Sequence, residues 1–360
     1  MSGEQWYPPP GAPPPGGPPP PGWPPPGWGP QAGVPHPGAP PPVLLGAAHK
    51  PGALPLRPLT LGDMYDAAFR IIRFNPRATV GSAVLVAAVS MALPILLTAV
   101  LTAAADLSFD RADPSVSTAD AVAFVGTAGS LLLGSVLQWI GMILVTGMVA
   151  HVTAAAAVGR RLSLREAWDA TRGKRWRLIG LACLVGLMLG AGVAVCVVVI
   201  VVAVVTLPTW AAVVFAVVAV PASLALCCWF YVRVCYLPAP ALILEPVGVG
   251  GALGRGFSLT RRQFWRTFGI ALLTVLVTSI AGSILSAPFS IGAQIVPLAM
   301  SDSRFAVLAL VVLSALGTVI QFAFVAPFTS AVTSLQYLDQ RMRKEAYDVE
   351  LLAAAGITAS

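Results

Sequence analysis

Few polar side chains in this sequence could do chemistry inside its apolar stretches. Four of them interrupt long apolar runs, namely Gln138, Arg233, Gln294 and Gln321. An ionisable residue in a hydrophobic segment is a candidate for function, because burying its charge is expensive. Arg233 is therefore the first candidate, although it lies near the end of its run and its long side chain could reach water. No Asp or Glu lies in the middle of a run, which argues against a proton- or sodium-coupled transporter.

The motifs of common catalytic and metal sites are absent from the sequence. It has no Gly-rich phosphate loop ending in Lys-Ser or Lys-Thr, no His-Glu-x-x-His and no Cys-x-x-Cys. The histidines are His36, His49 and His151, and the five cysteines all lie in apolar stretches, where a packing role is typical. We therefore expect no enzyme activity, no metal or other cofactor, and no nucleic-acid partner.

A repeat of an aromatic residue, an arginine and a glycine organises the chain. In each copy the arginine follows the aromatic residue by four positions and the glycine follows it by twelve, and a long apolar stretch comes next. The three copies are Phe69, Arg73 and Gly81; Trp168, Arg172 and Gly180; and Phe257, Arg261 and Gly269. Such a long period indicates the duplication of a unit that contains several elements.

A short amphipathic helix is predicted ahead of each glycine. In the first copy, apolar residues recur at helical spacing on one face; they are Leu61, Met64, Tyr65, Ala68, Phe69 and Ile72. Thr60 with Asp63, and Ser163 with Glu166, have the spacing of a capping box, which begins a helix. The third copy keeps the apolar face but lacks the cap.

Basic and aromatic residues at the turn into the apolar runs predict contact with lipid headgroups. The expected contact residues are Arg73, Arg172, Arg177, Arg261, Arg266, Trp176 and Trp265. A basic amphipathic helix with an aromatic anchor is typical of the layer between acyl chains and water. Each arginine near an anionic leaflet contributes about 1 kcal/mol. Ordinary topology marking would explain the charges, but it would not explain their fixed spacing in three copies.

Six apolar stretches are each long enough for the ~20 residues that a membrane-spanning helix needs. They are Ala78–Ala104, Ala121–Val158, Leu178–Leu207, Thr209–Leu237, Phe268–Ala299 and Phe305–Tyr337. We expect helices, because open strands in lipid would leave backbone groups unpaired and the alternation of a barrel is missing. With only 10% of residues charged, most of the surface must face lipid.

The sequence therefore predicts an all-α integral membrane protein with six transmembrane helices. Three repeated units, at about 59–158, 159–247 and 248–338, each consist of an interfacial amphipathic helix and a helical hairpin. If both termini are cytoplasmic, 20 of the 22 Lys and Arg residues lie on that side, which is a positive-inside pattern. We expect a multi-pass protein of the plasma membrane, with residues 339–360 as a cytoplasmic tail.

The first 58 residues form a separate segment by composition. They contain 22 of the 33 prolines and much Gly, so we expect a disordered cytoplasmic tail with polyproline II character. Trp6, Tyr7, Trp23 and Trp28 punctuate it. The tail could recruit a protein partner through its Pro and aromatic groups, or it could be a low-complexity spacer.

Three stretches resemble the membrane-domain family named after glycerophosphoryl diester phosphodiesterase, whose actinobacterial members include stand-alone multi-span proteins with Pro/Gly-rich amino tails. They are Arg57 to Asp63, Ser258 to Arg266, and the residues Tyr337, Asp339, Arg341, Arg343, Glu345 and Asp348. The resemblance covers roughly residues 57 to 352. The family's phosphodiesterase activity belongs to a separate soluble barrel of about 250 residues, for which this chain has no counterpart. The resemblance therefore implies the membrane part alone.

Two functions remain open at this point. The first is a non-catalytic membrane protein whose basic cytoplasmic face contacts anionic lipid and whose tail recruits partners. The alternative is a permease or lipid-translocating protein with a path between the three hairpins. That alternative predicts a polar groove where Gln138, Arg233, Gln294 and Gln321 converge.

Overall fold

The computed structural model of this chain describes residue 55 and residues 57–109, 116–299 and 306–354. The regular elements in these residues are all helices, as predicted. The prediction for residues 1–58 lies almost wholly outside the described residues. In chain order the elements are α1 (Leu61–Phe74), α2 (Pro76–Phe109), α3 (Val116–Ala157), α4 (Leu164–Ala170), α5 (Arg175–Thr206), α6 (Thr209–Phe230), the π-helix η1 (Tyr231–Cys235), α7 (Pro238–Leu244), α8 (Val249–Thr260), α9 (Phe264–Ala299), α10 (Ala306–Glu345) and α11 (Tyr347–Ala354).

Six helical segments in the described residues are long and apolar enough to cross a membrane, which confirms the predicted number. They are Pro76–Leu97, Leu132–Ala157, Arg175–Thr206, Thr209–Leu244, Phe264–Val296 and Leu308–Glu345. The last of them runs past the predicted end of its span at Tyr337. Helix α10 therefore continues through residues that were expected to begin the C-terminal tail.

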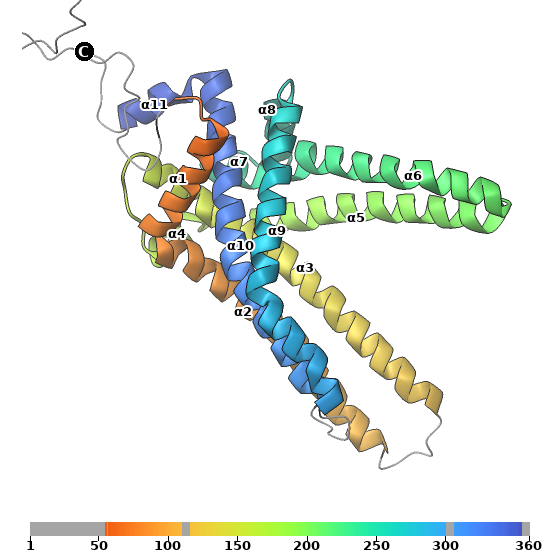
Figure 1. Cartoon of the computed structure of the whole chain (residues 1–360). Coiled ribbons are helices and arrows are strands. Elements are labelled where there is room, and N and C mark those ends of the chain that lie inside the picture. Colours follow the sequence, from red (N-terminus) through yellow and green to blue (C-terminus); the bar gives the residue numbers. More distant parts are fainter. Residues whose placement is uncertain (1–54, 56, 110–115, 300–305, 355–360) are drawn as a thin grey trace, which may run out of the picture. The chain divides into compact units, whose positions relative to one another are not determined.

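A short helix precedes each of the three long hairpins. Helix α1 comes before α2 and α3, α4 before α5 and α6, and α8 before α9 and α10 (Figure 1). The predicted capping boxes at Thr60 and Ser163 are both present, with Asp63 and Glu166 as the third helical residues. The predicted lack of a cap in the third copy is also confirmed, since Gly248 makes no side-chain capping bond at the start of α8.

Helix α10 is the centre of the packing. It lies against α9, α2 and α3, and it also contacts α1, α7, α8 and α11. Helix α1 buries Met64, Ala67, Ala68 and Ile71 and contacts α10, α2 and α3. Of the predicted apolar face, Met64 and Ala68 are buried, whereas Phe69 is half exposed. Helix α1 therefore packs on other helices and also presents apolar side chains outward.

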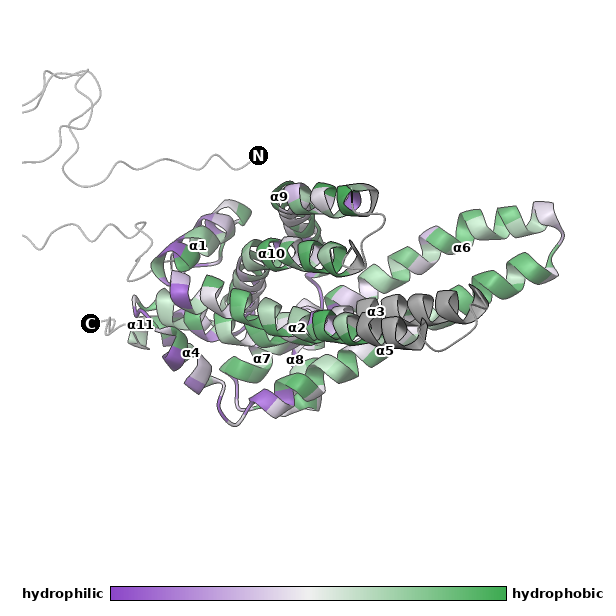
Figure 2. Ribbon diagram, turned by 90° about the horizontal axis from the view of Figure 1, so that it is seen from below, coloured by the Kyte–Doolittle hydropathy of each residue, from purple (hydrophilic) through white to green (hydrophobic). Residues whose placement is uncertain are grey.

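The hairpin of α5 and α6 is far less covered than the other helices. The most apolar window of α5 contains no buried residue, and that of α6 contains almost none. The two helices pack on each other, and the buried residues of α5 are concentrated near its start, from Leu178 to Val185. Figure 2 shows hydrophobic colouring along both helices, whereas hydrophilic residues gather on α1 and α4. A surface this apolar is suited to lipid.

Small residues after the repeated glycines provide the close packing. Ala83, Ala182 and Ala271 are all buried. The glycines themselves do not serve as contact points, because nothing lies within 4 Å of a Cβ built at Gly180 or Gly269. In these two copies the glycine therefore faces open space, whereas the alanine two residues later is buried.

Two elements between α6 and α8 were not predicted. The backbone widens into the π-helix η1, in which the Tyr236 N–H donates to the Tyr231 carbonyl at 3.0 Å. Helix α7 then buries six of its seven residues, Pro238 to Ile243, and contacts α3, α8, α5 and α10. Pro238 and Pro240 fit this helix, because Pro is well tolerated in the first turn.

The contact between α2 and α3 predicts a difference between two glycine substitutions. A Cβ at Gly141 would lie 2.4 Å from Cγ1 of Val86, whereas the space around Gly180 is open. Overpacking of this kind costs about 1–3 kcal/mol. Gly141→Leu should lower the midpoint of thermal unfolding in detergent, and Gly180→Leu should leave it nearly unchanged. Equal midpoints would contradict the packing of α2 on α3.

Candidate functional site

A buried carboxylate joins three distant parts of the chain. Asp339 of α10 is completely buried. Its Oδ1 accepts a hydrogen bond from the backbone N–H of Leu59 at 2.7 Å, just before α1. The Arg343 Nε lies 3.0 Å from both carboxylate oxygens, and the Arg266 guanidinium of α9 also donates to Oδ2. We call these four residues, Leu59, Arg266, Asp339 and Arg343, the Asp339 clasp.

The carbonyl of Leu59 completes the Asp339 clasp. It accepts from Arg266 Nη2 at 2.6 Å and from Arg343 Nη2 at 3.0 Å. Both polar backbone groups of Leu59 are therefore paired, although Leu59 lies outside any helix and is buried. A buried charge is tolerated only when it is paired and hydrogen-bonded. The Asp339 clasp thus fixes where the chain enters α1 relative to α9 and α10.

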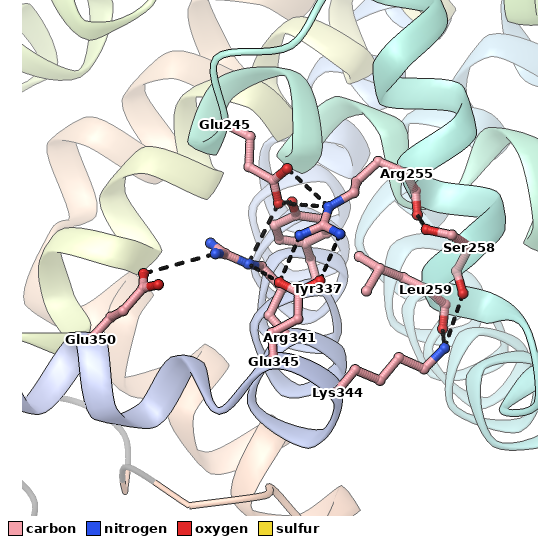
Figure 3. Close-up of polar contacts among 9 residues, drawn as sticks. All are labelled: Glu245, Arg255, Ser258, Leu259, Tyr337, Arg341, Lys344, Glu345 and Glu350. Carbon is pink, nitrogen blue, oxygen red and sulfur yellow. Dashed lines mark hydrogen bonds and ion pairs between the residues drawn. The ribbon is translucent and has the colours of Figure 1, made fainter.

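A second ionic network lies between α7, α8 and α10, and Figure 3 shows its side chains pointing toward one another. Arg255 Nε is 2.9 Å from an oxygen of Glu245, and its Nη1 is 2.6 Å from an oxygen of Glu345. Arg341 is 3.0 Å from Glu345 and 3.5 Å from Glu245. The Tyr337 hydroxyl donates to Glu245. We call these five residues the Glu245 network.

At Arg255 in the Glu245 network, burial and neighbouring negative charges shift the pKa in opposite directions. Burial alone would lower the pKa of its guanidinium. Hydrogen bonds to Glu345 and Glu245, together with their negative charges, outweigh that effect and raise the pKa above its ordinary value. The network therefore keeps Arg255 charged while it holds α8 against α10.

Two lysines cap the carboxyl ends of short helices. Lys344 Nζ donates to the carbonyls of Ser258, Leu259 and Arg261 at 3.0, 2.7 and 2.8 Å, at the end of α8. Lys174 Nζ donates to the carbonyls of Ile243 and Glu245, at the end of α7. A cation suits a helix C-terminus because unpaired carbonyls concentrate negative charge there. Partial burial, and then the charge of Arg177, lower the pKa of Lys174.

Most of the predicted headgroup residues have exposed side chains. Exposed arginines are Arg73, Arg172, Arg177 and Arg261. Trp176 and Trp265, each the second residue of its helix (α5 and α9), are 83% and 78% exposed. Arg266 differs from this group, because its guanidinium belongs to the Asp339 clasp. Its guanidinium is thus held by an internal ion pair, and its contact with lipid headgroups stays a prediction.

The three repeated aromatic residues do not make the same contacts. The Phe69 ring packs on Phe328 of α10, with ring centroids 4.8 Å apart. Trp168 is stacked under the guanidinium of Arg175 at 3.9 Å. Phe257 lies under the guanidinium of Arg233 at 4.8 Å. The repeat is therefore a shared sequence frame with different partners in each copy.

The four polar candidates of the apolar stretches do not form one site. Gln294 is exposed, and its Nε2 donates to the carbonyl of Ser290 on its own helix. Gln321 packs beside Gly282 of α9. Arg233 lies against aromatic rings, and Gln138 is half-buried in α3. The polar groove expected for a permease is not supported by these contacts.

Neither a metal-binding cluster in the described residues nor a matching protein points to another site. In that part of the chain, no three His, Cys, Asp or Glu side chains are grouped so that they could hold a metal ion. Comparisons with protein-family models, curated proteins and solved structures find no match. The family resemblance of the sequence therefore stays a prediction. Its three stretches nevertheless meet in the Asp339 clasp, through Leu59, Arg266 and Asp339.

The Asp339 clasp predicts a large loss of stability when its charge is removed. Asp339→Asn keeps the shape but leaves Arg266 and Arg343, each about 30% exposed, without their carboxylate. Breaking a buried ion pair costs about 3 kcal/mol, and we expect that loss in the free energy of unfolding in detergent.

The matched control for this substitution is Asp169→Asn. Asp169 lies 4.0 Å from Arg165, and its side chain is 53% exposed. An exposed pair contributes less than about 1 kcal/mol. If both substitutions changed the free energy of unfolding equally, the Asp339 clasp would not be the stabilising contact.

Proposed function

We propose that this chain is a non-catalytic, multi-pass protein of the plasma membrane whose basic face contacts anionic lipid headgroups. The observation that supports this is the exposure of the repeated arginines beside exposed tryptophans at the start of apolar helices. Arg172 and Trp176 flank the start of α5, and Arg261 and Trp265 flank that of α9. Tryptophan prefers the interface between acyl chains and water, and arginine binds phosphate through a planar fork.

We further propose that both chain ends and the short helices α1, α4 and α8 lie on the cytoplasmic side. The support is the distribution of charge, because 20 of the 22 Lys and Arg residues then fall on that side. In this orientation each short helix lies at the inner surface, and each hairpin crosses outward and back. The segment 1–58 would then offer its Pro and aromatic groups to a cytoplasmic protein partner.

The proposed lipid contact predicts a preference that depends on the repeated arginines. The full-length protein is reconstituted with trace spin-labelled phosphatidylglycerol or phosphatidylcholine, and electron paramagnetic resonance gives their relative association constants. The wild type should prefer phosphatidylglycerol. Replacing Arg73, Arg172 and Arg261 together by Gln should reduce this preference about fivefold or more, which corresponds to at least about 1 kcal/mol.

A control variant separates the repeat from total charge. Arg57, Arg160 and Arg165 are also exposed, and replacing these three by Gln removes the same charge outside the repeat. This control should lose less of the preference than the repeat variant. An equal loss in both variants, or a wild type without preference, would contradict the proposed role of the repeat.

A further inference from the structure

In the apolar part of the chain, Arg233 is the one charged side chain among the described residues that has buried nitrogen atoms without a hydrogen-bond acceptor. Its Nε and Nη1 are buried and have no hydrogen-bond partner among those residues. A buried charged donor left unpaired is costly, so such a group needs an explanation such as a bound ion or water. Arg233 lies in the π-helix η1, and π-helical turns occur frequently at functional sites.

Two aromatic rings lie near the guanidinium of Arg233. Its Cζ lies 4.8 Å from the ring centroid of Phe257 and 5.9 Å from that of Trp229. Aromatic rings attract the cation through the ring face, but they accept none of its in-plane N–H bonds. A phosphate that guanidinium binds in a bidentate manner would use Nη2 together with either Nε or Nη1, because Nε–H and Nη1–H lie on different edges of the group.

Positive charge gathers next to Arg233. Arg233 lies over Phe257 near the end of α8, and Lys344 Nζ is bonded to the carbonyls of Ser258, Leu259 and Arg261 at that end. The nearby carboxylate of Glu345 is already bonded to Arg255 and Arg341. This corner between η1 and the end of α8 therefore attracts an anion.

An apolar surface leads directly to this corner. Helix α6 runs into η1, and Leu226 and Trp229, three residues apart on one side of its last turns, are both exposed. Phe257 of α8 is also exposed, at 44%. An acyl chain could lie along this surface while its headgroup phosphate reaches Arg233. A free phosphate ion would make no use of the apolar surface.

We propose that Arg233, near the end of α8 where Arg261 and Arg262 follow, binds the phosphate of one anionic phospholipid whose acyl chain lies along α6. This inference rests on the proposed function, because it assumes that the chain is in a membrane and that η1 lies at its inner surface. It adds a discrete site to the general contact of the basic face. The bound lipid would supply the hydrogen-bond acceptor that Arg233 lacks.

Native mass spectrometry of the full-length protein in detergent tests this site. Titration with phosphatidylglycerol gives the Kd of the first bound lipid, and phosphatidylcholine and inorganic phosphate are titrated in parallel. Arg233→Gln should weaken the first phosphatidylglycerol about tenfold or more, as expected for a lost charged hydrogen bond. Arg233→Lys keeps the charge but lacks the planar fork, so its affinity should be intermediate.

Arg165→Gln is the matched control, because the Arg165 side chain is 92% exposed on α4, and it should leave the first Kd unchanged.

An unchanged Kd in Arg233→Gln would overturn the inference. If that variant does not fold, Arg233→Lys decides alone, and wild-type affinity in it would overturn the inference. Equal binding of phosphatidylcholine would exclude selection for an anionic lipid. Displacement of the lipid by inorganic phosphate would exclude a lipid source.

The outcome can be separated from that of the proposed function. A wild type that prefers phosphatidylglycerol in bilayers, together with an unchanged first Kd in Arg233→Gln, would overturn only the discrete site. A wild type without any lipid preference in bilayers would overturn the proposed function itself.

Discussion

A buried negative charge, the carboxylate of Asp339, constrains the described bundle more than any other single group. It cannot exist in an apolar interior without partners, and it takes them from before α1, from α9 and from α10 itself. The position of α1 therefore depends on α9, although these elements are about 200 residues apart in sequence, the separation of Leu59 from Arg266 being 207. The hydrogen bonds and ion pairs of Asp339 therefore join the first and third repeated units, in addition to the packing of their apolar surfaces.

The second repeated unit is held by different means. Lys174 caps α7, and α5 packs on α3 only near its start. Beyond that point, α5 and α6 contact each other and expose apolar side chains. The same sequence repeat therefore occurs in one hairpin whose surface suits lipid and in two hairpins that share a packed core. The polar side chains that stabilise the core lie at the end of the helices where α1, α8 and α11 meet α10.

The sequence was sufficient to predict the helices but not their partners. Apolar length predicted the six long helices, and local spacing predicted the capping boxes at Thr60 and Ser163, because these features depend on neighbouring residues. Asp339 was noticed as part of a motif, yet its role was not predicted, since it depends on Leu59, 280 residues away. Arg266 was expected at the lipid surface because its type and its position in the sequence fit that role. Only the fold shows that the carboxylate of Asp339 lies beside it.

Hydrogen exchange at the backbone amide of Leu59 tests the central claim most directly. This amide lies outside any helix, so its hydrogen bond is not part of a helical ladder but the one to Asp339 Oδ1, at 2.7 Å. Exchange of the full-length protein in lipid nanodiscs would be followed at single-residue resolution. The Asp339 clasp predicts that the Leu59 amide exchanges as slowly as the amides of α10 around Asp339. Exchange at the rate of an unprotected amide would contradict it.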